Sequence, residues 1–362
     1  MCAKNQYLLV LLSLLLAGLL AALSVSAAIS APSSSVSGRM GAEAQVSPVQ
    51  SPTDADRYLP VAAFNTRHNQ FLVVWHNHWS GSRDIYAQRL DLNGSKVGPW
   101  FCISTGAGDR VQPAVAYNAT NDEYMVLFMQ DVSAAKDGSQ YNIVGQRVAW
   151  NGVLNGGAFT IGTYPNVSFW SPRLAWNSTW NEYMAVWSTL DTTSHLATGI
   201  GMVILAPDGT IPYGTILTSD GYPTSPDLVY DSIHKNYLVV WQRLSASGKQ
   251  VIIGDLRDDN GNRARPDVFG IFGSTTNSSY YPRVTYSNGF YGVVFEYEIA
   301  ANDHDIYLAL VWYDGSTIIP LPVENTNTHD THADIAGNPA ALEYFSPFSG
   351  PMPSAPRFGC AR

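Results

Sequence analysis

The sequence is poor in charged residues, and it has fewer basic than acidic residues. Only 14% of its 362 residues are charged, with 20 Lys+Arg against 29 Asp+Glu, whereas an ordinary soluble protein has about 25%. The lack of a basic surface argues against a nucleic-acid partner, because binding phosphates requires one. Glu, Lys and Ala are also too few for a helical bundle. The sequence contains no GxSxG, HExxH, P-loop or GxGxxG motif, so no catalytic residue is predicted.

What the sequence does contain is typical of an all-β protein. Aromatic residues make up 12% of the chain, and it has 30 Gly and 21 Pro. Aromatic and β-branched residues favour strands, while Gly, Pro and Asn favour tight turns. The aromatic content also excludes a disordered chain.

The N-terminus resembles an export signal. Lys4 precedes the apolar run Tyr7–Leu23, and small residues end at Ala27, as signal peptidase requires. We expect a signal peptide at residues 1–27, a flexible leader at 28–43 and one folded domain at 44–362. The protein is then secreted or extracellular, and possibly attached to the cell surface. An uncleaved anchor is the alternative, and only that alternative gives contact with a membrane.

The folded part repeats with a period of 53 to 59 residues. Each repeat begins with an anchor proline followed by a short apolar strand, and the anchors are Pro60, Pro113, Pro172, Pro226 and Pro282. An apolar second strand ends in an aromatic residue, as in FLVVW and NYLVVW. Third strands follow at 84–91, 142–149, 199–206, 250–257 and 305–312, each before an Asn-Gly or Asp-Gly turn that suits a tight hairpin.

Four antiparallel strands per repeat at this period predict the blades of a β-propeller. Residues 333–362 match the first three strands of a sixth blade, and residues 44–58 resemble its fourth strand. We therefore expect six four-stranded blades, the last closed by the N-terminal strand, since closure removes open sheet edges. Five blades with a C-terminal appendage is the alternative, and a β-sandwich array or solenoid is another.

The repeats IYAQRLDLNGSKVG and VGQRVAWNGVL resemble those of secreted bacterial propeller proteins and large bacterial surface adhesins. The resemblance covers about residues 58–362. It implies the propeller architecture and an adhesin-like protein, and it brings no catalytic residues with it.

Histidines gather in loops that this topology places on one face of the propeller. His76 and His78 follow the second strand of blade 1, and His329 and His332 lie in the segment that leads into blade 6. Imidazole groups suit a divalent metal such as zinc, so these four are candidate ligands. Solvated loop residues are the simpler interpretation. Asp258–Asn262 resembles a calcium loop but lacks the bidentate Glu, and a hairpin turn explains it equally well.

Charged residues of alternating sign follow four successive anchors. They are Arg173, Asp227, Arg283 and Asp334, one residue after each anchor position on the predicted innermost strands. They form either inter-blade ion pairs or a polar funnel for a ligand, and mixed charge suits a sugar or zwitterionic peptide. Trp170, in the loop before Arg173, is a candidate sugar platform, with packing inside the loop as the alternative.

The sequence favours a secreted binding module over an enzyme. We expect this module to recognise a glycan or an extracellular protein through the interblade loops. A metal-assisted polysaccharide hydrolase or lyase at the same face is one alternative, and a structural surface-layer component is another. Cys102 and Cys360 are expected as free thiols, with a ring-closing disulfide as the alternative.

Overall fold

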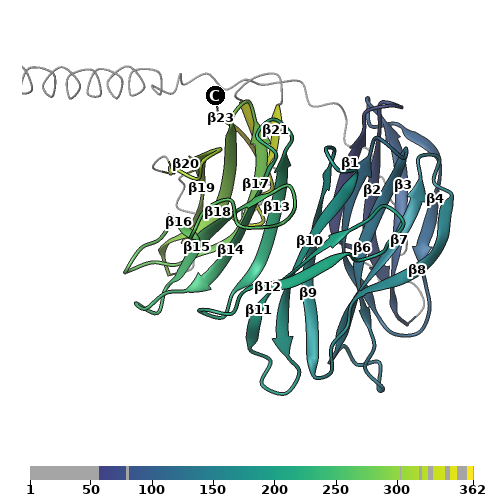
Figure 1. Cartoon of the computed structure of the whole chain (residues 1–362), viewed down its shortest axis with the longest axis horizontal. Coiled ribbons are helices and arrows are strands. Elements are labelled where there is room, and N and C mark those ends of the chain that lie inside the picture. The colour runs from purple at the N-terminus through teal and green to yellow at the C-terminus, as the bar shows by residue number, and fades with distance from the viewer. Residues whose placement is uncertain are drawn as a thin grey trace, which may run out of the picture. The chain divides into compact units, whose positions relative to one another are not determined.

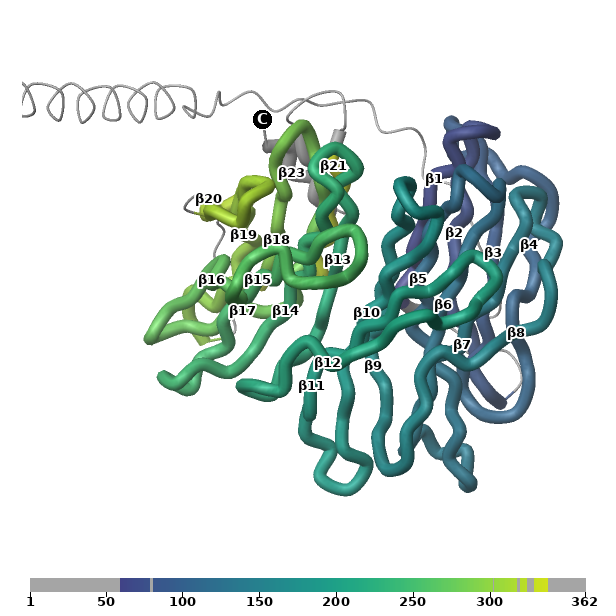
Figure 2. Tube along the Cα trace, in the orientation of Figure 1, coloured from purple at the N-terminus to yellow at the C-terminus, as the bar shows by residue number. Residues whose placement is uncertain are grey.

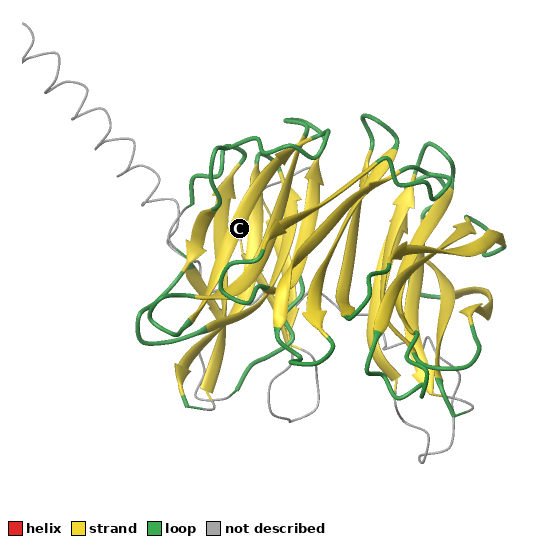
Figure 3. Ribbon diagram, turned by 60° about the horizontal axis from the view of Figure 1, so that its bottom comes forward, coloured by secondary structure: helices red, strands yellow, loops and turns green. Residues whose placement is uncertain are grey.

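The computed structural model describes residues 57–78, 81–301, 303–317, 320–324, 329–338, 343–348 and 357–361. These residues form 23 strands and no helix (Figure 3). In the part of the chain described, therefore, no helix is long and apolar enough to cross a membrane. The predicted signal peptide, leader and closing strand up to residue 56 lie outside the described residues.

The strands form six antiparallel sheets, which we call blades 1 to 6. Blade 1 contains β1 (Arg57–Asn65), β2 (Gln70–His78), β3 (Arg83–Asp91) and β4 (Lys96–Ser104). Blade 2 contains β5 (Arg110–Asn118), β6 (Glu123–Asp131), β7 (Tyr141–Ala149) and β8 (Leu154–Gly162). Blade 3 contains β9 (Val167–Asn177), β10 (Glu182–Asp191), β11 (Ala197–Leu205) and β12 (Tyr213–Thr218).

The remaining blades follow the same order. Blade 4 contains β13 (Thr224–Asp231), β14 (Asn236–Leu244), β15 (Gln250–Asp258) and β16 (Phe269–Phe272). Blade 5 contains β17 (Ser279–Ser287), β18 (Phe290–Ala300), β19 (Asp303–Trp312) and β20 (Leu321–Glu324). Blade 6 has three described strands, β21 (Ala336–Asn338), β22 (Glu343–Phe348) and β23 (Arg357–Ala361).

The blades pack face to face in chain order. The first strands contact one another in succession, β1 with β5, β5 with β9, β9 with β13, β13 with β17 and β17 with β21. Figures 1 and 2 show the same order as colour passing from purple in blade 1 to yellow at β20 and β21. Each apolar core cluster is shared by two neighbouring blades, for example Val126 and Ile85 between blades 1 and 2. The first strands are therefore the innermost ones, as in a β-propeller.

The structure confirms the predicted all-β propeller fold. Five blades have the complete set of four strands, so the five-blade alternative fits the described residues. The sheet β21–β22–β23 lies where the sequence places the first three strands of a sixth blade. Closure of that blade by residues 44–56 falls outside the described residues.

Strand positions agree closely with the repeat pattern. The predicted third strands match β3, β7, β11, β15 and β19 within two residues at each end. The turns after them use positive φ at glycine, with values from 77 to 98° at Gly94, Gly152, Gly209, Gly261 and Gly315. In the turn after β15, the Asp258 carboxylate accepts the N–H groups of Asn260 and Asn262. This segment therefore forms a hairpin turn, which was the alternative to a calcium-binding loop.

Buried polar pairs connect one blade to the next. The fully buried Tyr183 of blade 3 lies beside Asn118 of blade 2. The Asn118 side-chain oxygen accepts the N–H groups of Thr120 and Asn121 in its own turn. Burial raises the pKa of Tyr183. Tyr124 with Asn65 and Tyr237 with Asn177 repeat this arrangement at neighbouring blade junctions.

Cys102 on β4 is a free thiol whose Sγ lies 3.6 Å from the carbonyl oxygen of Ile85. Burial raises the pKa of this thiol, and the negative charge of Asp84 adds to the effect. This agrees with the expected free thiol. The side chain of Cys360 lies outside the described residues.

Candidate functional site

The four charged residues predicted from the repeat lie together on successive innermost strands, and we call them the charged ring. Arg173 is on β9, Asp227 on β13, Arg283 on β17, and Asp334 precedes β21. Arg173 Nε lies 3.5 Å from Asp227 Oδ1, so the predicted contact between neighbouring blades is present. These two side chains are only 22% and 13% exposed.

Asp227 connects three blades. Its Oδ2 accepts the N–H of Val284 on β17 at 2.8 Å, while Oδ1 faces Arg173 on β9. Burial raises the pKa of Asp227, although the positive charges of Arg173 and Arg283 oppose the shift. Carboxyl groups with shifted pKa values occur both at functional sites and in structural ion-pair networks.

The two arginines differ in their partners. Burial lowers the pKa of Arg173 to about 10, the charge of Arg283 acts in the same direction, and Asp227 and Asp334 oppose both. Arg173 remains cationic at neutral pH. Arg283 is half-buried, and its Nη1 donates to the carbonyl oxygen of Pro282 at 2.8 Å. Among the described residues, Arg283 has no carboxylate within ion-pair distance.

Asp334 completes the charged ring at an exposed position. Its Oδ1 accepts the N–H of Ile335 at 2.9 Å. Its charge reaches Arg173 and Asp227, because Asp334 contributes to the pKa shifts of both. The charged ring therefore holds two cations and two carboxyl groups, one of which is buried.

The predicted metal ligands separate into two environments. His76 was expected in a loop but lies inside β2 and is 2% exposed, because β2 continues to His78. His78 is exposed at the end of that strand. His329 and His332 are both exposed in the segment before β21. Within the described part of the chain, no three His, Cys, Asp or Glu side chains are placed to hold a metal ion.

A histidine cluster forms at the junction of blades 5 and 6, centred on Glu296 of β18. Glu296 Oε2 lies 3.2 Å from His304 Nδ1, and Oε1 accepts the N–H of His332 at 2.8 Å. The His304 and His329 rings are 4.5 Å apart. The sequence prediction missed Glu296, which is 3% exposed. The sequence feature that could have identified Glu296 is its position, a polar residue directly after the aromatic residue that ends an apolar strand.

Trp170 packs into the protein rather than standing free. Its indole Nε1 donates to Ser168 Oγ at 3.0 Å, and its ring meets Tyr141 edge-on with centroids 5.3 Å apart. It packs against the apolar core cluster shared by blades 2 and 3. The prediction that Trp170 lies in a loop is wrong, because β9 begins at Val167 and Trp170 pairs with Ser188 of β10. The contacts agree with packing rather than with a free sugar platform.

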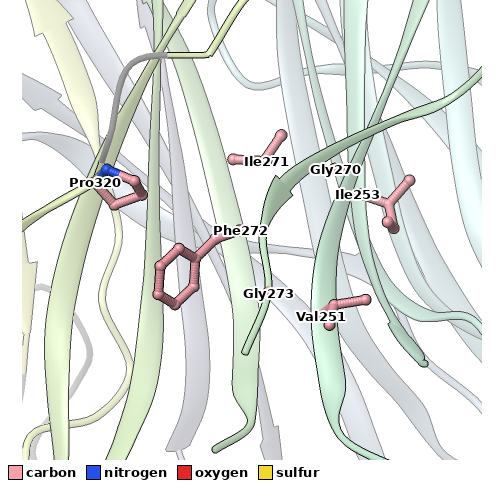
Figure 4. Close-up of a pocket in the computed structure, with 7 residues that line it drawn as sticks. All are labelled: Val251, Ile253, Gly270, Ile271, Phe272, Gly273 and Pro320. Carbon is pink, nitrogen blue, oxygen red and sulfur yellow. The ribbon is translucent and has the colours of Figure 1, made fainter. Parts of the chain in front are cut away.

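An apolar cavity of about 470 Å³ lies at β15, β16 and Pro320 (Figure 4). Val251, Ile253, Ile271 and Phe272 line it together with two glycines and Pro320. Its lining carries no charged side chain, so the cavity does not share the chemistry of the charged ring.

No protein-family model matches the sequence. No curated protein matches it either. Solved structures do resemble the chain. Hadza microbial sialidase Hz136 aligns with a TM-score of 0.57 and 10% identity, over 84% of this chain and 65% of that one. The chain thus spans just under two thirds of that sialidase.

Two further structures resemble the chain over most of their own length. A protein of unknown function from Dyadobacter fermentans DSM 18053 has a TM-score of 0.57 and 6% identity, over 83% of this chain and 92% of that one. The subtype N10 neuraminidase-like protein of A/little yellow-shouldered bat/Guatemala has a TM-score of 0.51 and 9% identity, over 85% and 96%. The chain has the propeller fold. At these identities the likeness extends to the fold alone.

Proposed function

We propose that this protein is a glycoside hydrolase that acts, at the charged ring, on glycans bearing a carboxylate. The observation that carries the proposal is the pairing of two features at adjacent blades. Arg283 is a half-buried cation with no carboxylate partner among the described residues, and Asp227 beside it is a buried carboxyl group with a raised pKa. The likeness in fold to a sialidase supports this choice of substrate class.

The chemistry assigns one role to each member of the charged ring. A guanidinium group binds a carboxylate through two parallel hydrogen bonds, so Arg283 would bind the carboxylate of an acidic sugar. Glycoside hydrolysis requires a protonated carboxyl group that delivers a proton to the leaving oxygen. Asp227 is suited to that role because burial favours its protonated form. Asp334, exposed to solvent, is the second carboxylate.

A glycan-binding module without catalysis is the second candidate, and the contacts of Asp227 favour it. Both oxygens of Asp227 already have partners, Arg173 and the N–H of Val284. If these contacts persist when a ligand binds, Asp227 acts as an inter-blade connector, and the glycan is retained without being cleaved. In either case we place the function outside the cell, as the export signal predicts, and the likeness to adhesin repeats remains a prediction.

The test is to incubate the purified protein with sialyllactose and to measure released sialic acid by chromatography. Arg283→Ala should lower the rate by about 10- to 100-fold, because it removes a charge-assisted hydrogen-bonding pair. Asp227→Asn should abolish release while leaving binding. The matched control is Arg243→Ala, which removes a half-buried arginine outside the charged ring that pairs with the exposed Asp220. If the protein retains sialyllactose without releasing sialic acid, the binding module is favoured. If it shows no retention and no release, both candidates are contradicted.

A further inference from the structure

The innermost strands share a backbone feature just before each anchor position. A non-glycine residue there has a φ of 50 to 57°, in the left-handed region, and the six residues are Leu59, Gln112, Ser171, Ser225, Tyr281 and His332. On β1, β5, β9, β13 and β17 the pairing with the second strand shifts register at this point. We call these six positions the bulge residues.

Left-handed backbone is costly for a residue with a side chain, about 1 kcal/mol or more each, and glycine avoids the cost. This chain uses glycine in the turn after each third strand, whereas the turns between first and second strands have left-handed non-glycine residues such as Asn69 and Asp122. No bulge position has glycine, so all six carry a side chain despite the strain. A strained conformation that recurs in this way is a common property of binding sites.

Side chains from neighbouring blades hold the bulges in place. The N–H of Tyr281 donates to Gln242 Oε1 of blade 4 at 2.7 Å, and that of His332 donates to Glu296 Oε1 of blade 5 at 2.8 Å. Equivalent bonds hold Ser171 through Gln112 and Ser225 through Ser188. These four side chains, Tyr281 among them, therefore start from fixed backbone positions, which lowers the entropic cost of binding a ligand.

The bulge residues stand next to the charged ring. Each charged-ring residue has a bulge residue two positions before it, so Tyr281 precedes Arg283 and Ser225 precedes Asp227. Tyr281 is 51% exposed, whereas Ser225 and Ser171 carry small side chains. The Tyr281 ring also lies 6.1 Å from that of Tyr280, which stacks on His304.

We propose that the bulge residues form a specificity collar above the charged ring, in which Tyr281 stacks against the apolar face of the sugar whose carboxylate Arg283 binds. This inference rests on the proposed function and adds its specificity-determining residue. A sugar ring presents C–H groups on one face, and an exposed tyrosine offers a flat apolar partner with a polar tip. The small Ser171 and Ser225 leave space on the side of the collar toward blades 3 and 4.

The experiment measures sialyllactose affinity by calorimetry for three tyrosine variants, with lactose as the neutral probe. Tyr281→Gly removes the ring and also relieves the left-handed strain, so the melting temperature should stay equal or rise while affinity falls about five- to tenfold. Tyr281→Phe keeps the ring and should bind as the wild type does. Tyr213→Ala, which removes a 44% exposed tyrosine of the outer strand β12, is the matched control and should change nothing.

The outcomes separate the inference from the function on which it rests. Loss of affinity in Tyr281→Gly together with retention in Tyr281→Phe supports the collar. If Arg283→Ala loses affinity while Tyr281→Gly binds normally, the collar is wrong and the proposed function stands. If the wild type binds no sialyllactose, or Arg283→Ala binds it normally, the proposed function fails and the collar with it.

Discussion

Gly201 on β11 leaves room for a tryptophan ring of the neighbouring strand β10. It pairs in register with Trp187, which is 5% exposed. A Cβ atom at Gly201 would lie 2.5 Å from Trp187 Nε1 and 2.8 Å from Cε2. The indole has little room to retreat, since it meets Phe169 edge-on at 5.8 Å and lies close to Gly162.

Gly201→Ala should therefore overpack the interior of blade 3. We expect a loss of about 2 kcal/mol in the free energy of unfolding, within the range of about 1–3 for overpacked cores. For a domain of this size, that corresponds to a fall in melting temperature of about 4 °C. Urea unfolding followed by tryptophan fluorescence and differential scanning calorimetry both measure the effect.

A matched control and a rescue sharpen this prediction. Gly157→Ala on β8 adds a Cβ that meets no heavy atom within 4 Å, so it should be neutral or stabilise by about 0.5 kcal/mol. Trp187→Phe should recover part of the loss in the Gly201→Ala background, which a double-mutant cycle reveals as coupling between the two sites. Equal stabilities for the two alanine variants would refute the packing argument.

Three further predictions concern charge, aromatic packing and metal. Burial opposes ionisation of Asp122, but hydrogen bonds from His68 and Tyr117 lower its pKa overall. The ionised carboxylate therefore contributes fully to folding stability above the ordinary pKa of about 4, and this contribution is lost as pH falls below it. Asp122→Asn should then cost about 1 kcal/mol at pH 6 and nearly nothing at pH 2 in urea unfolding, and an equal cost at both values would contradict this. Trp170→Ala should lower the melting temperature by several degrees because the ring is packed, whereas Trp180→Ala, at a 59% exposed position, should not. Zinc should leave the melting temperature unchanged, and a rise that EDTA reverses would instead support the predicted histidine ligands.

The repeat made the fold predictable because each blade repeats the same local chemistry. The anchor proline, the apolar second strand and the Asn-Gly or Asp-Gly turn mark three of the four strands in blade after blade. Equivalent positions on adjacent innermost strands must be neighbours in a propeller, which is why the contact between Arg173 and Asp227 followed from spacing alone.

Other features depend on contacts that spacing does not specify. The burial of His76 follows from where β2 ends, and sequence patterns locate the ends of strands poorly. On β9, Trp170 lies just before the register shift that separates it from Arg173. The shift breaks the regular alternation of side chains between the two faces of the strand, so the packing of Trp170 could not be inferred from its spacing to Arg173. Glu296 bonds to residues 8 and 36 positions away. The left-handed bulges occupy six positions with five different residue types, so no single residue type marks them in the sequence.

The most direct test of the central claim is a crystal structure of the Asp227→Asn variant soaked with sialyllactose. The account predicts ligand density at the charged ring, with the sugar carboxylate bonded to the Arg283 guanidinium and the sugar ring against Tyr281. Density confined to the apolar cavity at β16, or on a surface away from the innermost strands, would contradict it.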